Sequence, residues 1–174
     1  MTIRIATPAD VVALAALKRE TFAETFLEGG FAIPYPPADL AAFIAASYGE
    51  DKVAAELADS ERRTWVAEGP DGTLLGYAQI GPCKLPHADV AAGDGELYQL
   101  YIRRAGQGAG LGRALLREAL DHLAIARPGP VWLGVWSGNA RAQAFYQAEG
   151  FRAVGGYDFL VGAWTDAEYI YRRG

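Results

Sequence analysis

The stretch of sequence that decides the fold is ELYQLYIRRAGQGAGLGRALLREAL, residues 96–120. Its residues 97–102 are mostly apolar and aromatic, which is typical of the interior of a β-strand. Leu111, Leu115 and Leu123 recur at helical spacing, and charged residues occupy the opposite face. The stretch therefore predicts a strand, a glycine-rich turn and an amphipathic helix.

The glycines at 106, 108, 110 and 112 predict an anion site. Glycine has no Cβ, so the backbone can turn tightly and lie close to a ligand. The free N–H groups at the start of a helix, together with the positive end of its dipole, bind phosphate groups. No Lys-Ser or Lys-Thr pair follows, as a P-loop requires, and the spacing does not fit the dinucleotide fingerprint. We interpret the turn as a binding site for a pyrophosphate; the alternative is a turn that binds no ligand.

A second informative stretch is VWLGVWSGNARAQAFYQAEGF, residues 131–151. Alternating Val131, Leu133 and Val135 predict a strand. Ser137 or Asn139 can cap the helix that follows, and Gly150 suits the position after its end.

The two stretches together resemble the GCN5-related N-acetyltransferases (GNAT). QGAGLG at residues 107–112 fits the pattern Q/R-x-x-G-x-G/A, and L-x-V…N-x-x-A-x-x-F-Y…G-F follows at the expected distance. The resemblance is firm over residues 96–151. It implies one α/β (α+β) domain over residues 1–174, with a mixed central sheet that is splayed between its two core strands and flanked by helices. It also implies that acetyl-CoA is the acetyl donor, with its pantetheine in the opening of the sheet. Two histidines and one cysteine, all far apart in the sequence, give no metal signature, so we expect no metal.

The resemblance assigns the cofactor site to residues of both stretches. These are Leu100, Tyr101, Ile102, Gln107, Gly108, Gly110, Gly112, Arg113 and Asn139. Two of them have simpler alternatives, because Asn139 can be only a helix cap and Arg113 only a solvated surface residue.

Acetyl transfer to an amine needs an acid for the departing sulfur and an acceptor for the amine proton. By the resemblance, Tyr146 is the acid; the alternative is a tyrosine that only packs. Glu96 is the candidate base, acting directly or through water; the alternative is a solvated glutamate that holds the incoming cation or does nothing. Simple strand alternation places Glu96, Tyr98, Leu100 and Ile102 on one face.

A narrower similarity concerns the acceptor. RETFAETF at residues 19–26, WLGVW at 132–136 and GYDFLVG at 156–162 are similar to the spermidine/spermine (PaiA-type) branch. The implied substrate is a polyamine, bound by acidic residues that include Glu20, Glu24 and Asp158. The alternatives are that the Thr-Phe repeat is only the core face of a helix, that the acceptor is another small amine or a protein N-terminus, or that the chain is a non-catalytic acyl-CoA-binding regulatory module.

Composition narrows the function classes further. The chain has 174 residues and a net charge of −5, which suits a cationic small-molecule substrate better than nucleic acid. Cys83 is the only cysteine, so no internal disulfide can form. Without a signal-like N-terminus or a long apolar run, we expect a cytoplasmic protein with no membrane partner. The oligomeric state stays open, a homodimer included.

The remaining elements follow from local patterns. We expect strands over residues 3–6, 63–68, 73–80, 151–160 and 163–172. We expect helices from residue 8 or 10 through 26, over 37–48 and over 51–58. Residues 69–72, GPDG, predict a hairpin turn, and residues 83–95 a long polar loop.

Overall fold

The computed structural model describes residues 1–174, and one seven-stranded sheet runs through its centre. The strands follow one another in the order β1 (Thr2–Ile5), β2 (Arg63–Glu68), β3 (Leu74–Pro82), β4 (Gly95–Ile102), β5 (Val131–Trp136), β7 (Trp164–Arg173) and β6 (Arg152–Val161). The helices are α1 (Val11–Phe26), α2 (Pro37–Tyr48), α3 (Glu50–Ala58), α4 (Leu111–Ala126) and α5 (Ala140–Ala148), with 3₁₀ turns at Pro8–Asp10 and Arg104–Gly106. The elements expected from the sequence are confirmed, with ends that differ by one or two residues and a 3₁₀ turn before the first helix.

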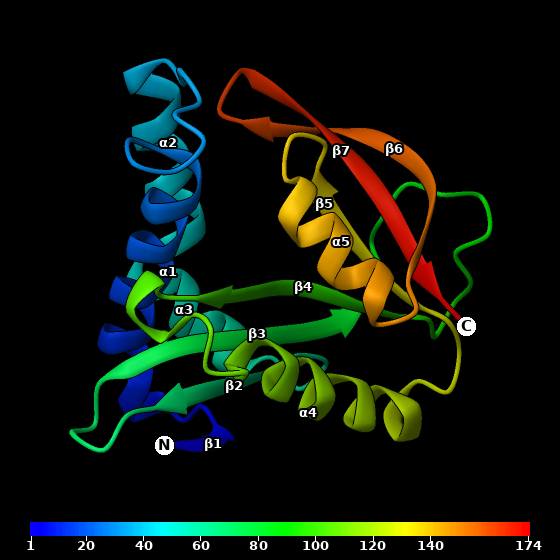
Figure 1. Cartoon of the computed structure of the whole chain (residues 1–174), viewed down its shortest axis with the longest axis horizontal. Coiled ribbons are helices and arrows are strands. Elements are labelled where there is room, and N and C mark those ends of the chain that lie inside the picture. The colour runs from blue at the N-terminus through cyan, green and yellow to red at the C-terminus, as the bar shows by residue number, and fades with distance from the viewer.

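The sheet is split between β4 and β5. All neighbouring strands pair in antiparallel fashion except these two, which are parallel. They pair only at Gly95 with Val131 and at Glu96 with Trp132, and then diverge, as Figure 1 shows. The predicted mixed, splayed sheet with flanking helices is therefore confirmed.

The helices cover both faces of the sheet (Figure 1). On one face, the apolar stripe of α4, including Leu115, Leu116 and Leu123, packs on β2 to β5, and Tyr146 of α5 joins the same cluster. On the other face, α1 and α3 pack on β2 and β3 through a smaller cluster that includes Leu14 and Leu17. None of the helices combines the length and the apolar character that crossing a membrane requires.

A third apolar cluster links the two halves of the molecule across the split. It contains Phe22, Tyr35, Tyr48 and Val161, which come from α1, the segment after it, the end of α2 and the end of β6. The hairpin of β6 and β7 reaches α2 (Figure 1), where Ala163 N donates to the Asp39 carboxylate at 2.9 Å. The helices and this hairpin therefore enclose a space beside the split.

One expectation for β4 is wrong. Gln79 pairs with Gln99 and Ile80 with Leu97, so Tyr98 is an extra residue in a β-bulge. The bulge shifts the alternation of side chains by one residue. Leu97, Leu100 and Ile102 consequently face α4, whereas Glu96 lies on the opposite face with Gln99 and Tyr101.

Candidate active site

The loop between β4 and α4 has an open backbone. Gly108 and Gly110 have φ values of +84° and +79°, a conformation that favours glycine. A Cβ added at either position would meet no atom within 4 Å, so the space above them is free. Gly110 is the N-cap of α4 and offers no side chain to the N–H groups of the first turn. This geometry leaves those donors available to an anion.

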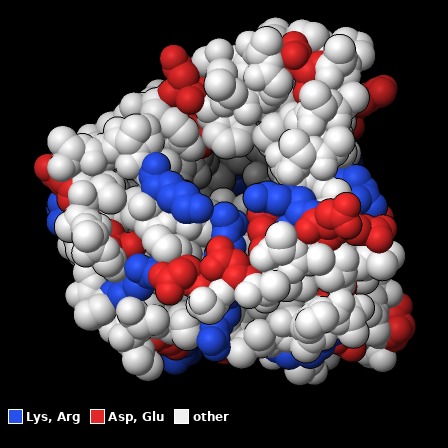
Figure 2. All heavy atoms as spheres, turned by 180° about the vertical axis from the view of Figure 1, so that it is seen from behind, with Lys and Arg blue, Asp and Glu red and all other residues white.

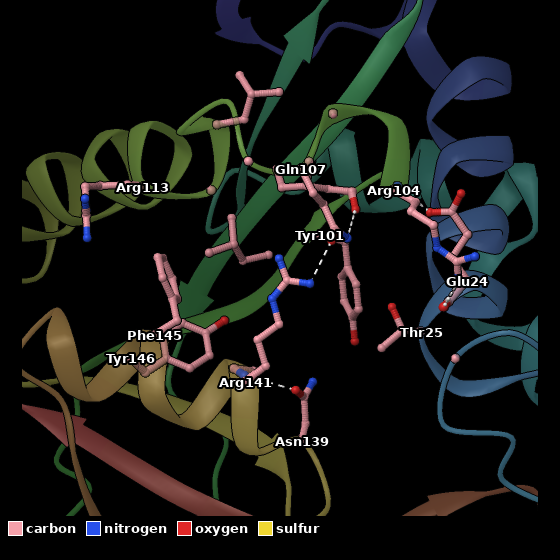
Figure 3. A pocket seen from close by; sticks show the side chains of 18 of the residues that line it. Glu24, Thr25, Tyr101, Arg104, Gln107, Arg113, Asn139, Arg141, Phe145 and Tyr146 are labelled. Carbon is pink, nitrogen blue, oxygen red and sulfur yellow. Dashed lines mark hydrogen bonds between the residues drawn. The ribbon is translucent and has the colours of Figure 1, made fainter.

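A groove with a volume of about 680 Å³ runs from this loop to α5 (Figure 3). We call it the cofactor groove. The structure brings together in it all ten residues that the sequence suggested for the cofactor and the acid: Leu100, Tyr101, Ile102, Gln107, Gly108, Gly110, Gly112, Arg113, Asn139 and Tyr146. Its far wall comes from α1 and the segment after it, through Glu24, Thr25 and residues 29–31.

The arginines of the cofactor groove differ in their roles. Arg113 is largely exposed, pairs with Glu149 at 2.6 Å, and points away from the centre in Figure 3. Arg141 of α5 donates to Gln107 at 2.9 Å and points into the groove. Arg141 was not among the residues suggested by the sequence, although its place two residues after the cap Asn139 pointed to the groove. Asn139 does cap α5, because its Oδ1 accepts from Ala142 N at 3.0 Å.

Tyr146 has the surroundings of a proton donor. Its ring packs against Phe145 and Phe151, and its hydroxyl makes no hydrogen bond within the protein and points into the groove in Figure 3. Burial raises the pKa of Tyr146 above its usual value, which keeps the phenol protonated at neutral pH.

A second pocket, with a volume of about 290 Å³, lies on the other side of Tyr101, which lines both spaces. We call it the acidic pocket. Its aromatic lining comes from Phe22, Phe26, Tyr35, Phe43, Tyr48, Tyr98, Tyr101, Trp136, Tyr157 and Phe159, and its carboxylates from Glu56, Glu96, Asp166 and Glu168. Figure 2 shows the face opposite to that of Figure 1, where the surface is hollowed and both basic and acidic side chains border the hollow.

The four carboxylates of the acidic pocket are held differently. Glu56 pairs with Lys18 at 2.7 Å, Arg62 at 3.3 Å and Lys52 at 3.6 Å. The other three carboxylates of the pocket accept hydrogen bonds only from uncharged groups. Glu96 accepts from Lys84 N, Asp166 from the Tyr35 hydroxyl and the Trp164 indole, and Glu168 from the Tyr157 hydroxyl, at 2.5–2.9 Å. Burial raises the pKa of Glu96, and it raises that of Glu168 to about 7.

The acidic residues expected at the acceptor site are only partly brought there. Glu96 lines the acidic pocket, but Glu20 lies outside and pairs with Arg103 at 2.7 Å. Glu24 lines the cofactor groove, where its carboxylate accepts from Arg104 N at 2.7 Å. Asp158 is exposed, because its neighbours Tyr157 and Phe159 take the pocket-facing positions of β6.

The residues that replace them, Asp166 and Glu168, were not among those suggested by the sequence. The usable signal was their spacing of two on the last predicted strand, which puts both on one face. No group of three or more histidine, cysteine or acidic side chains is arranged to hold a metal ion.

Comparison with known proteins agrees with this geometry. A sequence model described as the Acetyltransferase (GNAT) family matches residues 19–151. An uncharacterized N-acetyltransferase in the pepI 3′ region of Lactobacillus delbrueckii subsp. lactis is 27% identical over 164 residues, which cover 94% of this chain and 91% of that protein. The streptothricin acetyltransferase of Streptomyces lavendulae is 33% identical over 166 residues, which cover 87% and 82%. Among solved structures, the PaiA N-acetyltransferase of Thermoplasma acidophilum in complex with coenzyme A has a TM-score of 0.75 and 22% identity, with 99% of each chain covered.

Proposed function

Because the chain belongs to the acetyltransferase (GNAT) family, we propose that it moves the acetyl group of acetyl-CoA to a small primary amine that binds as a cation in the acidic pocket. The observation that carries the proposal is a set of three carboxylates without a cationic partner, the buried Glu96 and Asp166 and the half-buried Glu168, in a pocket that shares Tyr101 with the cofactor groove. Buried charges of one sign are costly unless an opposite charge joins them, so these carboxylates favour a cationic ligand.

The cofactor groove fits the acetyl donor on three counts. The glycine loop offers free N–H groups and room for a pyrophosphate at Gly108 and Gly110. Arg141 points into the groove and, with Arg104 in its lining, supplies positive charge for the phosphates. Beyond Glu96, the edge of β4 is not paired with β5, so its backbone can hold an extended pantetheine arm.

Two further features of the acidic pocket favour an ammonium group. The side-chain oxygen of Gln99, which lines the pocket, is buried without any hydrogen-bond partner. Such a group is rare in proteins and an ammonium N–H would satisfy it. The aromatic rings offer faces that attract a cation. Within this proposal we favour a polyamine, because three unpaired carboxylates suit a substrate with more than one positive charge.

The chemistry follows from the residues at the junction. An alkylammonium has a pKa near 10.4, so removing its proton at pH 7 costs roughly 4.6 kcal/mol, and a carboxylate of the acidic pocket accepts that proton. Bound acetyl-CoA supplies the thioester carbonyl that the neutral amine attacks. Tyr146 donates its phenolic proton to the departing sulfur, and the surplus proton on nitrogen returns to the phenolate. One acetylamine, one free thiol and one proton result.

An acceptor panel tests the proposal. The protein is mixed with acetyl-CoA and, in turn, spermidine, spermine, a monoamine of similar length, streptothricin and a peptide with a free N-terminus. Release of free thiol and the mass of the product are followed. We expect the polyamines to be acetylated fastest. Acetylation of the peptide alone would refute the small-amine assignment, and acetyl-CoA binding without transfer to any amine would favour a non-catalytic module.

A further inference from the structure

Glu168 of the acidic pocket occupies space that is free because residue 134 is a glycine. Its Oε2 accepts from the Tyr157 hydroxyl at 2.5 Å. The carboxylate lies over Gly134 of β5, where an added Cβ would be 2.6 Å from Glu168 Oε2 and 2.7 Å from the Tyr157 hydroxyl oxygen. Any side chain at residue 134 would therefore displace this pair. The second oxygen of Glu168, Oε1, has no hydrogen-bond partner in the protein and is free for a ligand.

The strand register separates Glu168 from Glu96. Glu96 lies opposite Trp132, at the last point where β4 and β5 are still paired. Glu168 lies opposite Trp136, and its carboxylate rests over Gly134, two residues beyond that last pair. A strand advances about 3.3 Å per residue, so the carboxylate of Glu168 is displaced towards the open part of the split by roughly two such steps. Under the proposed function, the pantetheine arm of the donor would end in this open part.

We propose that Glu168, rather than Glu96, takes the proton from the bound ammonium, and that Glu96 holds the cation. This inference rests on the proposed function. One N–H bond of the ammonium breaks, its electron pair stays on nitrogen, and the proton passes to Oε1 of Glu168 and later to water. The nitrogen uses that pair to form the C–N bond as the C–S bond breaks. The sulfur takes its proton from Tyr146, whose oxygen recovers one from the nitrogen.

The surroundings of Glu168 make it a stronger base than an ordinary glutamate. The titratable and charged groups that line the pocket with it are Tyr35, Tyr48, Lys52, Glu56, Arg62, Glu96, Tyr98, Tyr101, Tyr157 and Asp166. The pocket's two cations, Lys52 and Arg62, both pair with Glu56. Burial is the main cause that raises the pKa of Glu168 to about 7; the Tyr157 hydroxyl opposes the rise, and the charges of Asp166 and Glu96 add to it. Glu96, in contrast, lies near the positive charges of Lys84 and Arg62, which oppose the rise of its pKa, whereas no cation acts on Glu168 in this way. Tyr157 is thus a positioning residue for Glu168.

A pair of matched amide variants tests the assignment, with the substrate that the acceptor panel identifies. For Glu168→Gln we expect kcat to fall by about 10²-fold or more, and the acidic limb of the pH profile near pH 7 to disappear. For Glu96→Gln we expect a higher KM for the amine, a kcat within a few-fold of wild type, and a retained limb. Circular dichroism and acetyl-CoA affinity confirm that both variants fold.

Two further measurements follow the titration of Glu168 itself. In Tyr157→Phe the donor that lowers the pKa of Glu168 is gone, so the limb should move to higher pH. Carbon-13 NMR of the free protein should show a glutamate carboxyl that titrates near pH 7 and is absent in Glu168→Gln. An unchanged kcat and limb in Glu168→Gln, with both lost in Glu96→Gln, would overturn the assignment and make Glu96 the base. If the wild type acetylates no amine, it is the proposed function that fails.

Discussion

The cofactor groove and the acidic pocket share Tyr101, yet the chain builds them in opposite ways. The loop side of the groove is one continuous segment, from β4 through the glycines into α4, and its main feature is exposed backbone. The acidic pocket is made of side chains from α1, α2, α3 and five strands that meet only in the folded protein. A binding site made of backbone is visible in a short stretch of sequence. A binding site made of converging side chains depends on strand register.

The largest effect is expected at the glycine loop. Gly110→Glu adds a carboxylate where phosphate should lie and places an L-residue at φ +79°, so acetyl-CoA affinity should fall by more than about 10²-fold. Calorimetry measures this. Gly72→Glu is the matched control, because Gly72 also has a positive φ, +83°, and open space around it, but lies in the β2–β3 hairpin. Equal affinity in the two variants would contradict the assignment of the loop.

A smaller but still large effect is expected at Tyr146. Tyr146→Phe keeps the ring and removes the proton donor, so kcat should fall by about 10²-fold while acetyl-CoA affinity stays the same. Steady-state kinetics and calorimetry separate the two quantities. Tyr169→Phe, a change at an exposed tyrosine of β7, is the control. A kcat equal to that of the control would mean that another group protonates the sulfur.

A substitution in the acidic pocket should weaken binding of the amine substrate. Asp166→Asn removes a charge that only the Tyr35 hydroxyl and the Trp164 indole hold, so the KM for the amine should rise roughly tenfold with little change in kcat. The same variant should bind acetyl-CoA as the wild type does. If its KM were unchanged for every amine, the pocket would not be where the cation binds.

The smallest effect is expected at Asp158, which the sequence suggested for the amine. Asp158→Asn alters an exposed residue beside the pocket-facing Tyr157 and Phe159, so the KM for the amine should change by less than about twofold. Comparing it with Asp166→Asn shows whether position or net charge matters. Similar increases in KM for both variants would indicate a general electrostatic effect instead of a specific pocket.

The sequence predicted the elements well because each has a clear period and clear ends. It also suggested the groove residues, since the glycines and the Asn139–Tyr146 segment carry their pattern locally. It misplaced Glu96 because the bulge at Tyr98 changes the alternation of β4, and no residue type marks that bulge. It missed Asp166 and Glu168 because their role depends on β7 lying between β5 and β6, and no local pattern in the sequence shows that order of strands.

A crystal structure of the protein with coenzyme A and a non-reacting analogue of the preferred amine tests the central claim most directly. We expect the pyrophosphate at Gly108 to Gly112, the pantetheine between β4 and β5, and the amine nitrogen within hydrogen-bond distance of Glu168 in the acidic pocket. An amine bound outside the acidic pocket, with coenzyme A in its groove, would contradict the claim that the two spaces meet at Tyr101 as donor and acceptor sites.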